Sequence, residues 1–121
     1  SNVDVEILVD NFITIKGDEK LLEQAIINLI KNSLEALHEV ENPKIKIEAK
    51  IIEAHLQLSI EDNGMGIETD KIDDIFVPFY TSKEQGSGIG LSLVKQIVNI
   101  HKGHISVSSE KGIGTTFQIK L

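Results

Sequence analysis

The sequence contains no cysteine and no tryptophan, and aromatic residues make up 4% of its 121 positions. Without cysteine, no disulfide can hold the fold together, and nothing points to an oxidising compartment. The scarcity of aromatic side chains leaves few stacking platforms for single-stranded nucleic acid. No apolar run approaches the roughly 20 residues that cross a bilayer, and no secretory signal is visible. We expect a cytoplasmic chain that makes no direct membrane contact, although the full-length protein could be tethered to a membrane elsewhere.

Basic residues are also few, because 12 Lys and Arg stand against 19 Asp and Glu, a net charge of −7. An acidic surplus repels a polyphosphate backbone unless basic residues cluster, and here they do not. We therefore expect no nucleic-acid partner. The length suits one domain with its own core, so residues 1–121 are expected to form a single domain, cut from a longer protein whose missing part lies upstream.

Hydrophobic periodicity predicts the elements. Alternating residues predict strands at 3–9, 12–15, 44–51, 55–61, 105–109 and 115–121. Helical spacing predicts a helix over 19–37, with Asp18 as its N-cap, and another over 89–101, with Gly103 as its C′ residue. A short helix is expected before Pro78. Together they predict an α+β fold, a two-layer α/β sandwich in which a mainly antiparallel mixed sheet packs on three helices.

Two asparagines stand out on the first predicted helix. Asn28 and Asn32 are four residues apart, so they share one helix face, and Gln24 extends the polar stripe. Asparagine prefers caps to helix interiors, so two of them among leucines and isoleucines call for a reason. One reading is a solvated polar strip. The apolar neighbours favour the other reading, a buried strip whose amide oxygens bind a hard divalent cation.

A carboxylate and two glycines follow the strand predicted over 55–61. Asn63-Gly64 is a strong hairpin signal, but a hairpin requires another alternating strand, and helical spacing follows instead. Asp62 at a strand end can accept a hydrogen bond from an exocyclic amine, and Gly64 and Gly66 would let a flat ring approach the backbone. The pattern favours a purine site over a turn.

A third block, Gly86-Ser87-Gly88-Ile89-Gly90, runs directly into the helix predicted over 89–101. Loop amides at a helix N-terminus favour anions such as phosphates, whereas a flexible linker would not lead straight into an amphipathic helix. The block lacks the lysine of a P-loop and the spacing of a dinucleotide fingerprint. We interpret it as a phosphate-binding loop.

Phe76 and Phe79 flank Pro78 and are expected to anchor a lid over residues 80–85, in which Lys83 could reach a phosphate. His38 and Glu39 superficially imitate a phosphoacceptor motif, but they fall at a helix end, where a phosphoacceptor is not expected. His55, His101 and His104 have no spacing typical of a metal site or a catalytic triad, so we interpret all four histidines as surface or packing residues.

The blocks at 28–32, 62–66, 76–79 and 86–91, in this order, closely resemble the ATP-binding catalytic domain of sensor histidine kinases. That family belongs to the superfamily of gyrase, Hsp90 and the mismatch-repair ATPases. The resemblance runs from Gly17-Asp18 to Thr116-Phe117 and implies a Bergerat-type ATP-binding fold, with ATP and Mg²⁺ held between the helices and the lid.

The resemblance also implies roles for particular residues. Asn32 resembles the Mg²⁺ ligand, Asn28 its polar neighbour near the phosphates, and both are expected to be catalytic. Asp62 resembles the reader of the adenine amino group, and Thr116 the threonine that assists it through water. The residues expected to contact the nucleotide are Asp62, Gly64, Gly66, Ile67, Phe79, Lys83, Gly86, Ser87, Gly88, Ile89, Gly90, Leu91 and Thr116.

Two features depart from the family pattern. The lid between Phe79 and Gly86 is short, so closure over ATP would be incomplete in the isolated domain. Many relatives have a basic residue three positions after the metal-binding asparagine, where this chain has Glu35. Lys83 is then the better candidate for a phosphate contact.

The resemblance implies transfer of the γ-phosphoryl group to a histidine on a separate helical dimerisation domain, with a response regulator downstream. One alternative is an ATP-hydrolysing switch of the gyrase or Hsp90 type, but such enzymes have a general-base glutamate where Asn28 stands, and an amide cannot accept a proton near neutral pH. A second alternative is a degenerate domain that binds a nucleotide or partner without catalysis.

Overall fold

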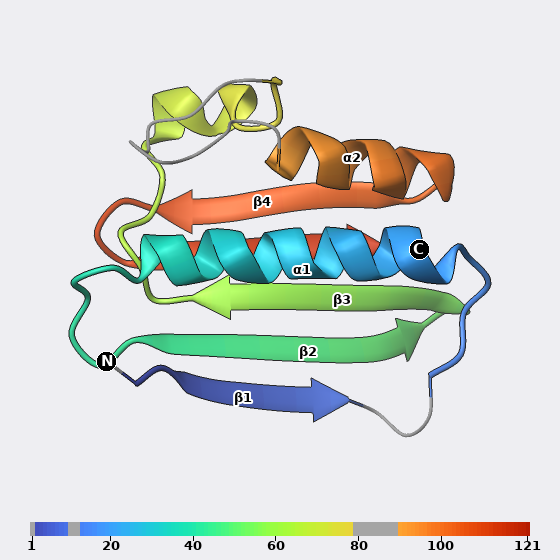
Figure 1. Cartoon of the computed structure of the whole chain (residues 1–121), viewed down its shortest axis with the longest axis horizontal. Coiled ribbons are helices and arrows are strands. Elements are labelled where there is room, and N and C mark those ends of the chain that lie inside the picture. The colour runs from blue at the N-terminus through green and yellow to red at the C-terminus, as the bar shows by residue number, and fades with distance from the viewer. Residues whose placement is uncertain (1, 10–12, 79–89) are drawn as a thin grey trace.

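The computed structural model describes residues 2–9, 13–78 and 90–121. Figure 1 shows their arrangement. The elements, in chain order, are β1 (Asp4–Val9), α1 (Glu19–Ala36), β2 (Lys44–Ile52), β3 (His55–Asp62), the 3₁₀-helix η1 (Thr69–Asp74), α2 (Gly90–Ile100), β4 (His104–Glu110) and β5 (Gly114–Lys120).

The strands described form one five-stranded sheet in the order β1-β2-β3-β5-β4. β1 runs parallel to β2, and the other neighbours are antiparallel. The predicted mixed, mainly antiparallel sheet is therefore confirmed. The strand predicted over 12–15 is wrong for residues 13–15, which form no strand, and Phe12 lies outside the described residues.

Both α-helices lie on the same side of the sheet, as Figure 1 shows, with α1 in front of β5 and next to β3, and α2 beside β4. We call this side the covered face and the opposite side the open face. Directly opposite residues share a face, so the rows across the strands can be read from the register. Ile60 and Phe117 form one such row, are fully buried, and belong to the covered face. Glu61 and Thr116 form the next row and belong to the open face.

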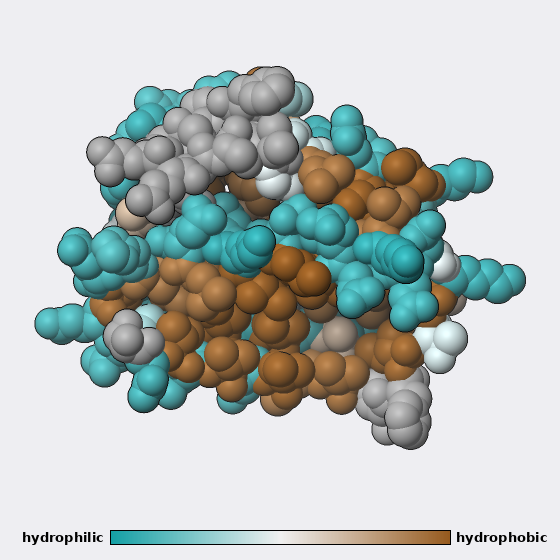
Figure 2. Space-filling model, in the orientation of Figure 1, coloured by the Kyte–Doolittle hydropathy of each residue, from teal (hydrophilic) through white to brown (hydrophobic). Residues whose placement is uncertain are grey.

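The core lies between the helices and the covered face. Burial of its aliphatic and aromatic side chains supplies the main free energy that stabilises the two layers against each other. Its members are Ala25, Leu29, Leu37, Ile45, Ile60, Ile75, Val94, Ile97, Val98, Ile105, Phe117 and Ile119. The helix layer does not extend over β1, so apolar side chains gather on the surface below α1 in Figure 2, among them Val5, Ile7 and Val9.

Helix α1 matches the predicted helix and its predicted cap. The Asp18 carboxylate accepts a hydrogen bond from the Leu21 amide at 3.0 Å, which satisfies one of the amides that a helix start leaves without a partner. The buried stripe, Ala25, Leu29, Ser33 and Ala36, keeps the spacing of three and four residues that places side chains on one face. This stripe determines which face of α1 packs against the sheet.

The end of α2 differs from the prediction. Lys102, not Gly103, takes the left-handed conformation, with φ of 59°. Gly103 is required for another reason, because a Cβ there would lie 2.5 Å from the carbonyl oxygen of Lys120. Its amide donates to the Val98 carbonyl at 2.9 Å.

His101 joins the two helices. Its Nε2 accepts from the Asp18 amide at 3.0 Å, so its Nδ1 carries the hydrogen and donates to the Ile97 carbonyl at 2.8 Å. The start of α1 is thereby tied to the end of α2. The packing role predicted for this histidine is confirmed, and His38, His55 and His104 are exposed, as expected.

The short helix predicted before Pro78 is the 3₁₀-helix η1, and the residues after it anchor the chain to the core. The rings of Phe76 and Phe117 pack edge to face, with centroids 6.3 Å apart. The Lys95 ammonium of α2 lies 5.5 Å from the centroid of the Phe76 ring. The structure therefore confirms that Phe76 packs against the core, while the lid that it was predicted to anchor lies outside the described residues.

Candidate active site

Asp62 is the last residue of β3 and lies on the covered face, in the row that continues from Ile45 of β2. Its side chain is 3% exposed, and Oδ1 accepts a hydrogen bond from the Gly64 amide at 2.9 Å. A buried carboxylate is costly unless it is hydrogen-bonded. The strand and the turn after it thus hold the Asp62 carboxylate in one orientation at the end of the helix-covered layer.

The turn after Asp62 docks on the C-terminal end of α1. The Met65 amide donates to the Ala36 carbonyl at 3.1 Å, and a Cβ at Gly64 would lie 2.5 Å from that same oxygen. A helix end has carbonyls without intrahelical partners, so this bond satisfies one of them. Asn32 lies one turn before Ala36, so the contact brings the asparagine-bearing end of α1, meaning the last turns that carry Asn32, to the turn after Asp62.

Gly66 makes a second close approach, to the β4–β5 hairpin. Its φ is 73°, and a Cβ would lie 2.1 Å from the Glu110 carbonyl oxygen. The Gly112 amide donates to the Met65 carbonyl at 2.8 Å beside it. We predicted that Gly64 and Gly66 admit a ligand ring, but the atoms that crowd both positions belong to the chain itself. The two glycines let three elements converge at the end of the covered face.

The register places Thr116 away from Asp62. Thr116 is paired with Glu61 and therefore lies on the open face, on the opposite side of the sheet from Asp62. Thr115 is directly opposite Asp62 and is 5% exposed. The missed signal was the alternation of β5, because Phe117 is buried, and the residue two positions before it must share its face.

Ser109 of β4 was also missed. It is directly opposite Thr115, so Asp62, Thr115 and Ser109 form one row across β3, β5 and β4. The Ser109 hydroxyl accepts from the Ile67 amide at 2.7 Å, donates to the Gly114 carbonyl at 3.0 Å and lies 2.8 Å from the Thr115 hydroxyl oxygen. Ile67, predicted to contact the nucleotide, is held by the first of these bonds.

Asn28 and Asn32 lie at the edge of the buried stripe of α1, and both are half-buried. The prediction of a buried polar strip is thus correct in part, since Gln24, which was expected to extend it, is exposed. The side-chain nitrogen of Asn28 is buried and has no hydrogen-bond partner in the part of the chain that the structure describes. A buried amide donor of this kind calls for an acceptor.

The N-terminus of α2 begins at Gly90, and Gly90 and Leu91 are both half-buried. A Cβ at Gly90 would meet no described atom within 4 Å. The other residues predicted to bind the phosphates or flank them lie outside the described residues: Phe79, Lys83, Gly86, Ser87, Gly88 and Ile89.

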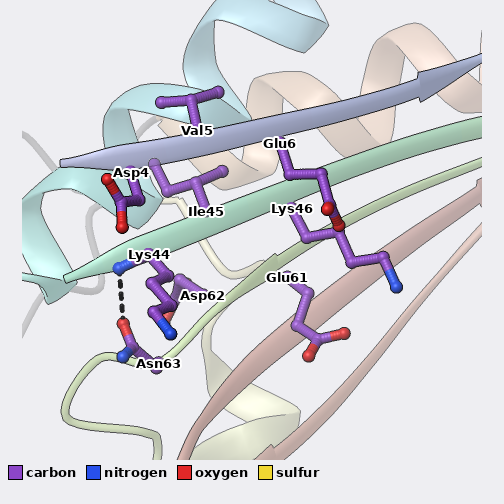
Figure 3. A pocket seen from close by; sticks show the side chains of 9 residues that line it. All are labelled: Asp4, Val5, Glu6, Lys44, Ile45, Lys46, Glu61, Asp62 and Asn63. Carbon is purple, nitrogen blue, oxygen red and sulfur yellow. Dashed lines mark hydrogen bonds between the residues drawn. The ribbon is translucent and has the colours of Figure 1, made fainter. Parts of the chain in front are cut away.

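A hollow of about 510 Å³ lies at the edge of the sheet and is shown in Figure 3. Its lining mixes carboxylates and lysines from β1, β2 and the end of β3, and Asn63 closes one side by accepting a hydrogen bond from the Lys44 amide at 2.7 Å. Of the residues predicted to bind the nucleotide, only Asp62 lines it. Gly64, Gly66 and Ile67 lie elsewhere, where the turn after β3 contacts the C-terminal end of α1 and the β4–β5 hairpin.

Within residues 2–9, 13–78 and 90–121, no three His, Cys, Asp or Glu side chains group as a metal site. Over the same residues, no helix has both the length and the apolar character needed to cross a membrane.

Comparison with known proteins shows the family. Residues 17–121 match the model of the histidine kinase-, DNA gyrase B-, and HSP90-like ATPases. Sporulation kinase E of Bacillus subtilis is 38% identical over 122 residues, which cover 100% of this chain and 16% of the relative. The C4-dicarboxylate transport sensor protein DctB of Rhizobium meliloti is 41% identical over 105 residues, covering 87% of this chain and 17% of that protein.

Solved structures agree with this assignment. A mycobacterial sensor histidine kinase, MprB, superposes with a TM-score of 0.86 at 28% identity, covering 98% of this chain and 82% of that one. Full-length ShkA in complex with AMPPNP gives a TM-score of 0.84 at 26% identity, covering 98% of this chain and 25% of that one. The chain spans less than a fifth of the two curated relatives described above. The chain belongs to the histidine kinase-, DNA gyrase B-, and HSP90-like ATPase family, and within it to the catalytic domains of sensor histidine kinases.

Proposed function

We propose that this domain binds ATP with Mg²⁺ and transfers the γ-phosphoryl group to a histidine of a helical phosphoacceptor domain. The observation that carries the proposal is the buried Asp62 carboxylate, which the Gly64 amide fixes at the strand end, directly opposite Thr115 and beside the asparagine-bearing end of α1.

Asp62 is suited to recognise adenine. An ionised carboxylate only accepts hydrogen bonds, and the exocyclic amine of adenine donates them. Because Oδ1 already accepts from Gly64, the carboxylate is oriented before a ligand arrives, which lowers the entropic cost of binding. Thr115 takes the assisting role that was predicted for Thr116, because it lies on the same face as Asp62.

The residues on α1 fit a nucleotide-bound Mg²⁺. This ion prefers oxygen ligands and keeps several waters, so one or two protein oxygens and the substrate phosphates suffice. The Asn32 amide oxygen would hold it, and no cluster of three acidic groups is needed. The bound ion supplies neutralisation of the phosphate charge. The buried Asn28 nitrogen, which has no described partner, is suited to donate to a phosphate oxygen or to water.

Asn28 favours phosphorylation of histidine over hydrolysis of ATP. Water must lose a proton to attack a phosphoryl group efficiently, and an amide cannot take it. A neutral imidazole already has a lone pair and needs no base. The protein then contributes positioning and charge neutralisation, which are the main requirements of phosphoryl transfer.

The remaining parts of the proposal concern residues and partners beyond the described structure. The backbone amides at Gly90 and Leu91, together with the block 86–89 and Lys83, would bind the triphosphate at the start of α2. The acceptor histidine lies on the helical dimerisation domain of the full-length protein, and a response regulator receives the phosphoryl group. The domain itself would act in the cytoplasm.

Calorimetric titration with ADP, with and without Mg²⁺, tests this function. We expect saturable binding that Mg²⁺ strengthens, and loss of that strengthening in Asn32→Ala. In the full-length protein, the same variant should lose phosphohistidine formation. Lys31→Ala, the adjacent and exposed position on α1, is the matched control and should keep both properties. Rapid basal hydrolysis of ATP, or no binding of ADP by the wild-type protein, would contradict the proposal.

A further inference from the structure

The Ser109 hydroxyl lies within hydrogen-bond distance of three polar atoms. The Ile67 amide is 2.7 Å away and can only donate, and the Gly114 carbonyl oxygen is 3.0 Å away and can only accept. The Thr115 hydroxyl oxygen, at 2.8 Å, can do either. A serine hydroxyl has one hydrogen and two lone pairs, so it can make one donated and two accepted bonds.

One assignment of the hydrogens satisfies all three contacts. Ser109 gives its hydrogen to the Gly114 carbonyl and accepts from the Ile67 amide and from the Thr115 hydroxyl. In the other assignment, Ser109 donates to Thr115, and its lone pairs then face those of the Gly114 oxygen across 3.0 Å without a hydrogen between them. The first assignment is therefore favoured, and Thr115 donates its hydrogen to Ser109.

This direction matters because Thr115 stands between Ser109 and Asp62 in the row across the sheet. When the hydroxyl hydrogen of Thr115 points toward β4, the hydroxyl oxygen of Thr115 has only lone pairs directed toward β3. Asp62, as a carboxylate, also only accepts. The row therefore presents two acceptors side by side at the end of the covered face, and both are buried.

We propose that Ser109 is a positioning residue that sets base specificity: by holding the Thr115 hydroxyl as an acceptor, it selects purines with a 6-amino group over those with a 6-oxo group. The inference rests on the nucleotide site proposed above. An amino group donates two hydrogens and satisfies the acceptors, directly or through a water. A 6-oxo group would bring a further acceptor against them, and an unsatisfied buried acceptor is costly.

The test compares ADP with inosine diphosphate, which has a 6-oxo group in place of the 6-amino group and a hydrogen on N1, in calorimetric titrations of the whole chain. In the wild-type protein, inosine diphosphate should bind more weakly. In Ser109→Ala, the Thr115 hydrogen is released and can turn toward the base, so the ratio of the two dissociation constants should fall by about two- to tenfold, the range of one neutral hydrogen bond. The ratio is the decisive quantity because a general loosening of the site weakens both ligands.

Three variants make the test specific. Ser109→Thr keeps the hydroxyl and should retain the wild-type ratio. Ser108→Ala removes the neighbouring serine, which is exposed and paired with Thr116 on the open face, and should change nothing. Thr115→Val should lower the ratio by itself, and adding Ser109→Ala to it should have no further effect, since Ser109 acts through Thr115.

The outcomes separate this inference from the proposed function. If the wild-type chain binds neither diphosphate, the proposed function fails. If it binds ADP and Ser109→Ala keeps the wild-type ratio, the Ser109 inference is overturned while the function stands. If urea titration shows that Ser109→Ala does not fold, Thr115→Val is used in its place. An unchanged ratio of the two dissociation constants in Thr115→Val also overturns the inference.

Discussion

Two adjacent acidic residues on β3, and two adjacent threonines on β5, lie on opposite faces of the sheet. Asp62 and Thr115 on the covered face are 3% and 5% exposed, whereas Glu61 is exposed and Thr116 is half-buried on the open face. Each pair differs by one step along a strand. Register, more than residue type, therefore decides which acidic or hydroxyl group lies on the covered face.

The contrast has an energetic basis. On the covered face, the helices exclude water, so a polar group there must have a designated partner, and its orientation is fixed. On the open face, Glu6, Lys46 and Glu61 form a row of exposed charges across three strands, where water solvates each of them. Solvated surface charges contribute little to stability.

The largest expected difference between the faces is in stability. Phe117→Ala removes a fully buried ring and should lower the free energy of unfolding by about 3–5 kcal/mol. Gln118→Ala, one residue further and on the open face, should change it by less than about 0.5 kcal/mol. Urea denaturation followed by circular dichroism measures both. Equal losses of unfolding free energy in the two variants would contradict the view that the helices bury only the covered face.

The next difference is in nucleotide affinity. Asp62→Asn replaces an acceptor-only carboxylate by a group of the same shape and should weaken ADP binding by about ten- to a hundredfold, the range of a hydrogen bond to a charged group. Glu61→Gln, the adjacent residue on the open face, should leave the dissociation constant unchanged. Titration calorimetry on both proteins measures the two dissociation constants, and a comparable loss of affinity in Glu61→Gln would show that binding does not depend on the face of the sheet.

A smaller effect is expected for the two threonines. Thr115→Val keeps the side-chain shape and removes the hydroxyl, so ADP affinity should fall by about two- to tenfold, the range of one neutral hydrogen bond. The matched Thr116→Val variant should bind ADP as the wild-type protein does. The reverse ranking would restore the role that the sequence assigned to Thr116.

The smallest effect concerns the outer edge of the covered face, where Lys95 lies over the Phe76 ring. Lys95→Met keeps the aliphatic stem but removes the cation, and should reduce the free energy of unfolding by about 0.5–1 kcal/mol. Lys95→Arg keeps the cation and should retain the wild-type stability. Thermal denaturation at matched salt concentration tests the pair, and identical stability of Lys95→Met and the wild-type protein would show that this contact does not stabilise the fold.

Much of this fold follows from local patterns in the sequence. The extent of α1, the Asp18 cap and the strands β2, β3, β4 and β5 were predicted to within a few residues, because periodicity and capping act over a few residues. Asp62 was identified as a candidate site residue because the hairpin signal Asn63-Gly64 is followed by helical spacing and not by a second strand. The role expected of it in binding adenine stays a prediction until a ligand is measured.

Other features depend on contacts between segments far apart in the chain. Gly103 was predicted to have a special backbone angle, yet it is needed because Lys120 approaches it closely. The role of Ser109 could not be predicted from local patterns, because it arises only from contacts of β4 with β5 and with the turn before η1. The position of Thr115 could have been deduced from the alternation of β5, but the family resemblance pointed to its neighbour.

The central claim is that the Asp62 end of the covered face binds the nucleotide base. Its most direct test is a titration of the ¹⁵N-labelled chain with ADP and Mg²⁺, followed by amide chemical shifts. We predict that the amides of 62–67 and of 114–115 shift together and saturably, while those of 46–50 and 118–120 stay in place. Saturable shifts confined to residues 4–6 and 44–46, around the hollow of Figure 3, would contradict the claim.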